Sequence, residues 1–216
     1  MLKLLIFDLD GTLAETGQDI TDALNHCIEP FGGKPYSVEE VRMMVGSGMT
    51  KLLASIIRPL KGGDTPEAVE LVTRRFIDFY TEHMMDNTFL YPHVKETLSK
   101  LTGHKMAVLS NKREGFSRKI LADLEILEYF DLLWGSDSVR EKKPSPVPIL
   151  DLMDKFGVSK DETAIIGDSN FDVDAGRAAG IKVIAATYGF RPRSFLEGAD
   201  HIIDSFDELL EIIPNM

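Results

Sequence analysis

The chain has 216 residues, enough for one ordinary domain with a small insertion and for a core that needs no disulfide or structural metal. Its 35 acidic and 24 basic residues give a net charge of -11, which argues against binding to nucleic acids or anionic membranes. No apolar run approaches the ~20 residues that span a bilayer. The single cysteine, Cys27, excludes an intrachain disulfide and every CxxC motif. We therefore expect a cytoplasmic protein that contacts neither nucleic acid nor membrane.

The first expected element is a buried strand that ends abruptly in acidic residues. Residues 3–7 are a short apolar run, and DLDG follows at residues 8–11. From residue 16 to residue 85 the pattern changes to three or four amphipathic helices with no convincing strand. The longest of these helices is expected over residues 68–84. This order predicts an all-helical insertion directly after the first strand of a larger domain.

Strands and helices alternate from residue 92 onward. Apolar runs typical of buried strands occur at residues 105–109, 163–166, 182–186 and 201–203. Helical spacing of apolar residues occurs at residues 92–101, 113–124, 146–156, 172–179 and 206–213. Near-continuous apolar strands separated by helices indicate βα units and a parallel sheet that is covered on both faces. The expected fold class is therefore α/β, with a parallel-sheet core.

Four polar motifs stand out between these elements. They are DLDGTL at residues 8–13, SNK at residues 110–112, KPSP at residues 143–146 and GDSNFD at residues 167–172. The carboxyl ends of parallel strands meet at one edge of the sheet, which is where ligands bind in open α/β folds. We therefore expect the four motifs to form one site.

The acidic residues of these motifs indicate a metal site. Asp8, Asp168 and Asp172 are expected to converge, with Asp10 two residues beyond Asp8. Carboxylates gathered in one place resist ionisation unless a cation offsets their charge. Oxygen ligands of this kind suit Mg²⁺, which binds in near-octahedral geometry and often keeps a substrate phosphate among its ligands. The acids therefore predict bound Mg²⁺.

The basic and amide groups predict an anion site beside that metal. Ser110 and the backbone amides of Asn111 and Lys112 are expected to open a helix, where N–H groups attract anions. Lys143 adds a positive charge for a phosphate oxygen, and the proline that follows favours it over Lys142 for this role. Metal, anion site, lysine and a spare carboxylate together indicate phosphoryl transfer, whose catalysis is mainly positioning and charge stabilisation.

In order and spacing, the motifs DLDGT, SN, K-P and GDSxxD resemble those of the haloacid dehalogenase-like superfamily. The resemblance runs from the first expected strand to the last. It implies a Rossmann-like core formed by residues 1–15 and 86–216. It also implies that the helical segment, residues 16–85, is a small cap domain of the kind called type 1 in this family.

The resemblance further implies a role for each acid. Asp8 would be the nucleophile that forms an aspartyl-phosphate, and Asp10 would be the general acid and then the general base. Mg²⁺ would be held by the Asp8 and Asp168 carboxylates and by the backbone carbonyl of Asp10. Asp172 would act on the waters of the metal and on Lys143 rather than directly on the metal.

The same resemblance assigns the phosphate oxygens to Ser110, Asn111 and Lys143. Asp10 separates the chain from the dehalogenases of the superfamily, which lack an acid at that position, and from its ATPases, which carry threonine there. A plainer interpretation of Asp172 stays open, because an aspartate at this point could simply cap the following helix.

The stretch GDSNFDVDAGRAAG at residues 167–180 and the turn TYGF at residues 187–190 resemble the phosphoglycolate phosphatase-like branch. The expected activity is hydrolysis of a small phosphorylated metabolite by a monomer or homodimer, with 2-phosphoglycolate as the first candidate. Residues 14–17, AETG, depart from the D-S pattern of many relatives, which bears on substrate identity. Three alternatives stay open: a phosphomutase of the β-phosphoglucomutase type, a pyrophosphatase or nucleotidase, and a non-catalytic protein that binds a phosphorylated ligand.

Overall fold

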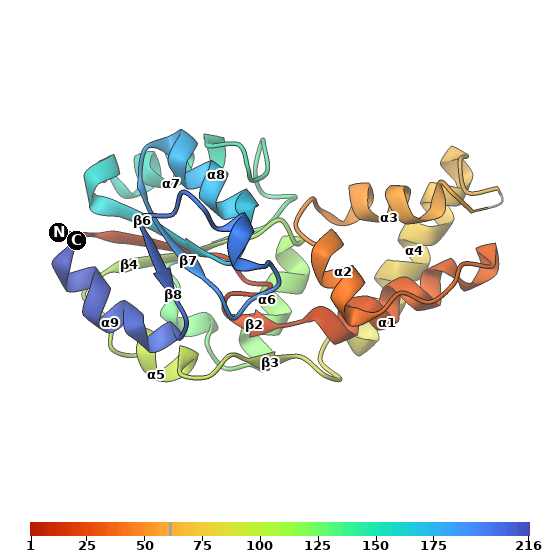
Figure 1. Cartoon of the computed structure of the whole chain (residues 1–216), viewed down its shortest axis with the longest axis horizontal. Helices are drawn as coiled ribbons and strands as arrows, with labels where there is room; N and C mark the ends of the chain where they lie inside the picture. Colours follow the sequence, from red (N-terminus) through yellow and green to blue (C-terminus); the bar gives the residue numbers. More distant parts are fainter. Residues whose placement is uncertain (61) are drawn as a thin grey trace. The chain divides into compact units, whose positions relative to one another are not determined.

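The computed structural model describes residues 1–60 and 62–216, which divide into two compact units (Figure 1). One unit is Met1–Glu15 together with Phe89–Met216, and the other is Thr16–Thr88. The chain therefore leaves the first unit after Glu15 and returns to it at Phe89. This return lies beyond the expected residue 85, because Thr88 still hydrogen-bonds to Asp19 of the helical unit.

The first unit is built on a six-stranded sheet in which every neighbouring pair is parallel. In spatial order its strands are β5 (Leu132–Trp134), β4 (Lys105–Leu109), β1 (Leu4–Phe7), β6 (Thr163–Gly167), β7 (Lys182–Ala186) and β8 (His201–Ile203). The first strand of the chain thus lies at the centre of the sheet, between β4 and β6. The predicted α/β class with a parallel, Rossmann-like sheet is confirmed.

Three short strands were not expected from the sequence. The strand β5 has three residues at the edge of the sheet, and two of them are only half-buried. So short a run carries no alternation that a pattern could reveal. The strands β2 (Ala14–Glu15) and β3 (Phe89–Leu90) form a separate antiparallel pair where the chain leaves and re-enters this unit.

Helices cover both faces of the large sheet (Figure 1). In chain order they are α5 (Val94–Leu98), α6 (Glu114–Asp123), α7 (Val147–Phe156), α8 (Asn170–Ala179) and α9 (Leu209–Ile212). The helices α7 and α8 lie on one face, and α5 and α9 lie on the other.

The central strand shows why its sequence is apolar without interruption. Leu4 and Ile6 join the core cluster that α7 and α8 complete. Phe7 belongs to the opposite face, where its ring centroid lies 5.9 Å from that of Phe130 and 6.0 Å from that of Phe206. Because both faces are buried, alternation with polar residues is absent from β1 and the polar chemistry begins only where the strand ends.

All regular elements among the described residues of the second unit are helices, as expected for the insertion. Its helices are α1 (Gly17–Ile28), α2 (Val38–Met44), α3 (Met49–Ile57) and α4 (Pro66–His83). The buried carboxylate of Asp19 closes the unit by accepting hydrogen bonds from the Asn87 backbone N–H at 2.9 Å and the Thr88 hydroxyl at 2.7 Å. Among all described residues, no helix has both the length and the apolar composition needed to cross a membrane.

Candidate active site

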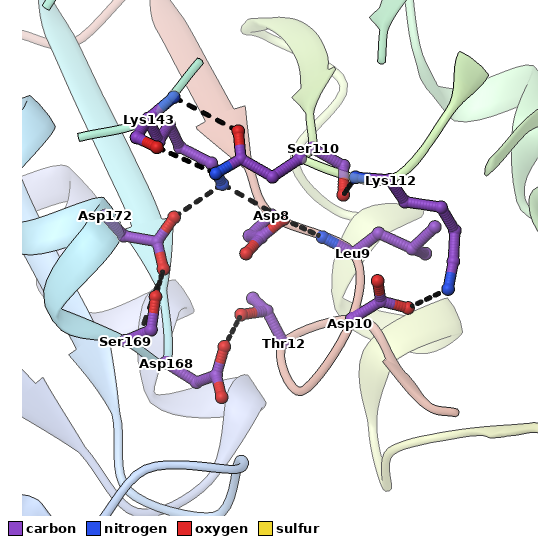
Figure 2. A network of polar contacts seen from close by, with 11 residues as sticks. Asp8, Leu9, Asp10, Thr12, Ser110, Lys112, Lys143, Asp168, Ser169 and Asp172 are labelled. Atoms are coloured by element: carbon purple, nitrogen blue, oxygen red, sulfur yellow. Dashed lines mark hydrogen bonds and ion pairs between the residues drawn. The ribbon is translucent and has the colours of Figure 1, made fainter. Parts of the chain in front are cut away.

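The loop after β1 carries Asp8 at the carboxyl edge of the sheet (Figure 2). The Asp8 N–H continues the sheet by donating to the carbonyl of Ile166 at 2.9 Å, so the position of this residue is determined by β6. The Leu9 N–H donates to Asp8 Oδ1 at 2.7 Å. Gly11 has φ +84°, a conformation that side chains rarely allow, and turns the loop back toward the sheet.

Asp168 follows β6 and is almost completely buried, with 2% of its surface exposed. Its two carboxylate oxygens are held from two different loops. Thr12 Oγ1 donates to Oδ1 at 3.2 Å, and the Phe190 N–H donates to Oδ2 at 2.6 Å. A Cβ atom at Gly11 would lie 2.2 Å from Oδ2 of Asp168, so only glycine fits beside this carboxylate.

Asp172 lies in the first turn of α8 and has two functions there. One oxygen, Oδ2, caps the helix by accepting from the Ser169 hydroxyl at 2.5 Å and from the Ser169 N–H at 3.2 Å. The other, Oδ1, lies 2.6 Å from Lys143 Nζ. Asp172 therefore caps the helix with one oxygen and contacts Lys143 with the other, so the two interpretations are compatible.

Lys143 joins the acidic groups from the opposite side of the site (Figure 2). Its ammonium group lies 3.0 Å from Asp8 Oδ1 as well as close to Asp172, and its side chain is 1% exposed. Its backbone is held by the Asn111 side chain, which donates to the Lys143 carbonyl at 2.8 Å and accepts from the Lys143 N–H at 3.1 Å. The peptide bond to Pro144 is cis.

Ser110 ends the neighbouring strand β4 at the same edge. It is buried, its N–H donates to the Trp134 carbonyl at 3.0 Å, and its hydroxyl accepts from the Lys112 N–H at 3.2 Å. The helix that follows begins at Glu114, so residues 110–112 form the loop before it rather than its first turn. The two-way pairing of Asn111 with Lys143 connects this loop to the acidic cluster.

Burial gives the site unusual electrostatics. Burial raises the pKa of Asp8 to about 7, with the negative charges of Asp172 and Asp10 adding to the effect and Lys143 opposing it. Burial also raises the pKa of Asp168 well above its ordinary value, and Asp172 and Asp8 reinforce this. Burial alone would lower the pKa of Lys143, yet Asp172 and Asp8 raise it. Lys143 therefore stays charged among acids that it only partly neutralises.

The donor set fits a hard divalent cation. Asp8, Asp168 and Asp172 each offer a carboxylate oxygen, and these oxygens lie within 4.8 Å of one another. Oxygen-only donors of this kind are typical Mg²⁺ ligands. A cation placed among them would offset the repulsion that raises the pKa values of Asp8 and Asp168. The residues present thus suit the expected metal.

One functional contact was not anticipated from the sequence. Lys112 Nζ lies 2.8 Å from Asp10 Oδ1, and both side chains are largely buried, at 7% and 9% exposure. The pair is separate from the three clustered carboxylates (Figure 2). The sequence pointed to Lys112 only through its backbone amide. The lysine directly after Ser110 and Asn111 was the one available signal, since no spacing rule connects it to Asp10.

Comparisons with known proteins identify the family of the chain. The model of the haloacid dehalogenase-like hydrolases matches residues 5–186. A phosphoglycolate phosphatase of Chromobacterium violaceum is 34% identical over 217 residues, which cover 99% of this chain and 97% of that protein. One from Aquifex aeolicus is 33% identical over 195 residues, covering 88% and 86%.

Similarity in three dimensions extends over the same length. The crystal structure of a predicted phosphoglycolate phosphatase from Haemophilus somnus has a TM-score of 0.92 to this chain at 31% identity, with 98% of both chains covered. The match therefore covers the helical unit as well as the sheet. The chain belongs to the haloacid dehalogenase-like hydrolases, in their phosphoglycolate phosphatase-like branch.

Proposed function

We propose that the chain is a Mg²⁺-dependent phosphatase that hydrolyses a small phosphorylated metabolite, with 2-phosphoglycolate as the first substrate to test. The observation that carries the proposal is the cluster of Asp8, Asp168 and Asp172 with Lys143 beside Asp8 and Asp172, at the carboxyl edge of a parallel sheet. The choice of substrate is supported by relatives named phosphoglycolate phosphatase that are 33% and 34% identical.

In the first half-reaction, the Asp8 carboxylate attacks the phosphorus atom in line. The bond between phosphorus and the ester oxygen breaks, and Asp10 donates a proton to the departing alkoxide. The products of this step are the free alcohol and an aspartyl-phosphate on Asp8. Lys112, which lies 2.8 Å from Asp10, holds that carboxyl group in a defined place beside the reacting bond.

In the second half-reaction, Asp10 takes a proton from a water molecule that attacks the same phosphorus atom. The bond between phosphorus and the Asp8 oxygen breaks, which releases inorganic phosphate and regenerates the carboxylate. Because Asp10 gives a proton in one step and takes one in the next, its protonation state is restored after each turnover.

The metal would be held by the carboxylates of Asp8 and Asp168 and by the Asp10 backbone carbonyl. When bound, Mg²⁺ supplies positive charge that stabilises the negative charge on the phosphoryl oxygens. Asp172 keeps Lys143 in place through their 2.6 Å contact. Burial and the neighbouring carboxylates raise the pKa of Asp8 to about 7 although Lys143 opposes them, so a bound cation would favour the ionised form of this nucleophile at neutral pH.

The phosphate oxygens would be bound by the Ser110 hydroxyl, the Lys143 ammonium group and the loop around Asn111. The Asn111 side chain already bonds to the Lys143 backbone, so its contribution to phosphate binding falls to its backbone N–H. The Asn111 side chain instead holds the backbone of Lys143 in place. We further propose that the helical unit, Thr16–Thr88, is the cap that selects the substrate, and that the enzyme works in the cytoplasm as a monomer or homodimer.

The decisive experiment measures phosphate release by the purified full chain, with and without Mg²⁺, on phosphoglycolate, hexose phosphates, nucleotides and pyrophosphate. We expect one dominant substrate, strict dependence on Mg²⁺ and no turnover by Asp8→Asn. Asp174→Asn is the matched control, because Asp174 lies exposed on α8 and should leave turnover unchanged.

Other outcomes would redirect the assignment. Phosphate release only from pyrophosphate or nucleotides would replace the substrate class. Little release, but conversion of a hexose phosphate in the presence of a bisphosphate primer, would identify a mutase. No turnover with any compound, combined with thermal stabilisation by Mg²⁺ and beryllofluoride, would indicate a binding protein.

A further inference from the structure

The carboxylate of Asp168 is oriented by two loops that lie far apart in the sequence. Thr12, in the loop after β1, donates its hydroxyl to Oδ1, and Phe190, in the loop after β7, donates its N–H to Oδ2. The orientation of Asp168 therefore depends on how these two loops are held relative to each other.

Tyr188 connects the two loops directly. Its hydroxyl group donates to the backbone carbonyl of Thr12 at 3.2 Å, and Tyr188 stands two residues before Phe190 on the other loop. The loops also touch through their backbones, since a Cβ atom at Gly189 would lie 2.3 Å from the Gly11 carbonyl oxygen and 2.3 Å from Asp168 Cβ. A contact this close leaves no room for a side chain at position 189, and the Tyr188 hydroxyl beside it adds a hydrogen bond between the two loops.

The ring of Tyr188 packs against Tyr91, which lies close to the point where the chain re-enters the sheet unit. Its centroid lies 4.8 Å from that of Tyr91, at an interplanar angle of 53°. The Tyr91 hydroxyl donates to Glu15 Oε2 at 2.8 Å, and its N–H donates to the Leu13 carbonyl at 3.1 Å. Glu15 is the last residue before the chain leaves this unit. Through Tyr91, the loop after β7 is thus connected to Leu13 and Glu15, which lie just before the chain leaves the sheet unit.

We infer that Tyr188 is a positioning residue for the metal site: its hydroxyl holds Thr12, and through Thr12 and Phe190 it keeps both oxygens of Asp168 oriented for a divalent cation. The inference rests on the proposed role of Asp168 as a metal ligand. Groups that orient a ligand carboxylate typically change metal affinity by about 10–100-fold when they are removed.

The test is titration calorimetry of Mg²⁺ binding to the full chain. Tyr188→Phe keeps the ring and its contact with Tyr91 and removes only the hydroxyl. We expect it to weaken Mg²⁺ binding by about tenfold. The control is Tyr129→Phe, a half-buried tyrosine of the same unit in the short 3-10 helix Leu127–Tyr129, and this variant should bind Mg²⁺ as the unchanged protein does. Equal affinities for Tyr188→Phe and the control would overturn the inference.

A second measurement tests the route through Thr12. Thr12→Val removes the hydroxyl that holds Asp168 Oδ1, so adding Tyr188→Phe to it should cost less affinity for Mg²⁺ than Tyr188→Phe costs by itself. Full additivity of the two losses would contradict this route. Asp168→Asn separates the inference from the proposed function: undiminished Mg²⁺ binding by that variant would remove Asp168 from the metal site, whatever Tyr188 does.

Discussion

Lys112 and Asp10 form an ion pair whose burial sets it apart from the many ion pairs at the surface of the molecule. Exposed pairs hold their partners weakly, because water competes for both charges. The Lys112–Asp10 contact, at 2.8 Å with both side chains at most 9% exposed, is shielded from this competition. Its position beside the proposed acid and base makes it a positioning contact for both proton transfers.

Replacing Lys112 by Met should therefore lower kcat by about tenfold or more while changing KM much less, since general acid–base catalysis depends on placement of the carboxyl group. Lys112→Arg should retain part of the activity. The matched control is Lys119→Met, which removes an ion pair of similar length, 2.7 Å to Asp123, at the surface. Steady-state kinetics on the best substrate measures all three. An unchanged kcat in Lys112→Met would show that Asp10 needs no such partner.

Gly11 shows how closely the site is packed at the scale of a single atom. Gly11→Ala introduces a methyl group at φ +84° and within 2.2 Å of an Asp168 oxygen. Gly32→Ala is the matched control, with φ +67° and no atom within 4 Å of its new Cβ. Gly32→Ala should lower the free energy of unfolding by about 1–2 kcal/mol, because the left-handed conformation disfavours side chains. Gly11→Ala should lower it by more, because its methyl group also overlaps the Asp168 carboxylate.

Only Gly11→Ala should also weaken Mg²⁺ binding, since Asp168 must move to make room. Urea unfolding together with calorimetric Mg²⁺ titration separates the two effects. Equal Mg²⁺ affinity in the two variants would mean that the loop shifts and leaves the carboxylate in place.

At the scale of elements, the helix α8 connects stability with chemistry. Its first turn is capped by Asp172, and the same side chain holds Lys143 with its second oxygen. A helix cap thus becomes part of the active site because α8 starts directly after β6, at the carboxyl edge of the sheet. The expected helix began at residue 172, whereas α8 starts at Asn170. The two extra residues place Asp172 within the first turn, where its side chain can reach back to Ser169.

Ser169→Ala removes the hydroxyl that bonds to Asp172 and should cost about 1 kcal/mol of unfolding free energy, a typical value for a lost cap. It should also lower kcat, because Asp172 then holds Lys143 less firmly. Ser159→Ala is the control: Ser159 and Glu162 form the same kind of capping box at a short helix before β6. We expect a similar loss of stability from it and full kcat. Equal kcat for both variants would confine the role of Ser169 to stability.

At the scale of the whole molecule, the reactivity of the single cysteine can be used to measure whether the helical unit is folded. Cys27 is fully buried on α1, and its thiol donates to the Leu24 carbonyl at 3.1 Å. Burial raises the pKa of Cys27 to about 12, from an ordinary value of 9.0. The thiol is therefore neutral in the folded protein at pH values where an unfolded chain already carries a thiolate. Its contribution to stability is complete below about pH 9 and decreases as the pH rises from there toward 12.

Iodoacetamide should label Cys27 roughly a thousandfold more slowly in the native protein at pH 8.5 than in urea, because only the thiolate reacts. Mass spectrometry of the labelled chain follows the reaction, and glutathione in the same tube corrects for the effect of urea on the reagent. Labelling of the native protein at the rate of glutathione would contradict the burial of this thiol.

Several strands were predictable because each is encoded by a continuous run of neighbouring residues. The order of the motifs can likewise be taken directly from the sequence. Burial of β1, β4, β6 and β7 between two layers of helices demands continuous apolar runs, and such runs are visible in the sequence. The strand β5 was missed because three residues at a sheet edge, two of them half-buried, leave no pattern. The boundaries of α4, α6, α7 and α8 followed from spacing in the same way, within a few residues.

By itself, the sequence determined the fold class, the family and the acids and lysine that gather at one edge of the sheet. Each of these depends on which residue type follows which strand. Only the tertiary structure decided how those groups are partnered. Asn111 and Lys143 are 32 residues apart, and Thr12 and Asp168 are 156 apart. Contacts of this kind depend on the directions of side chains from separate loops, and these directions are established only when the strands pair and bring the loops together.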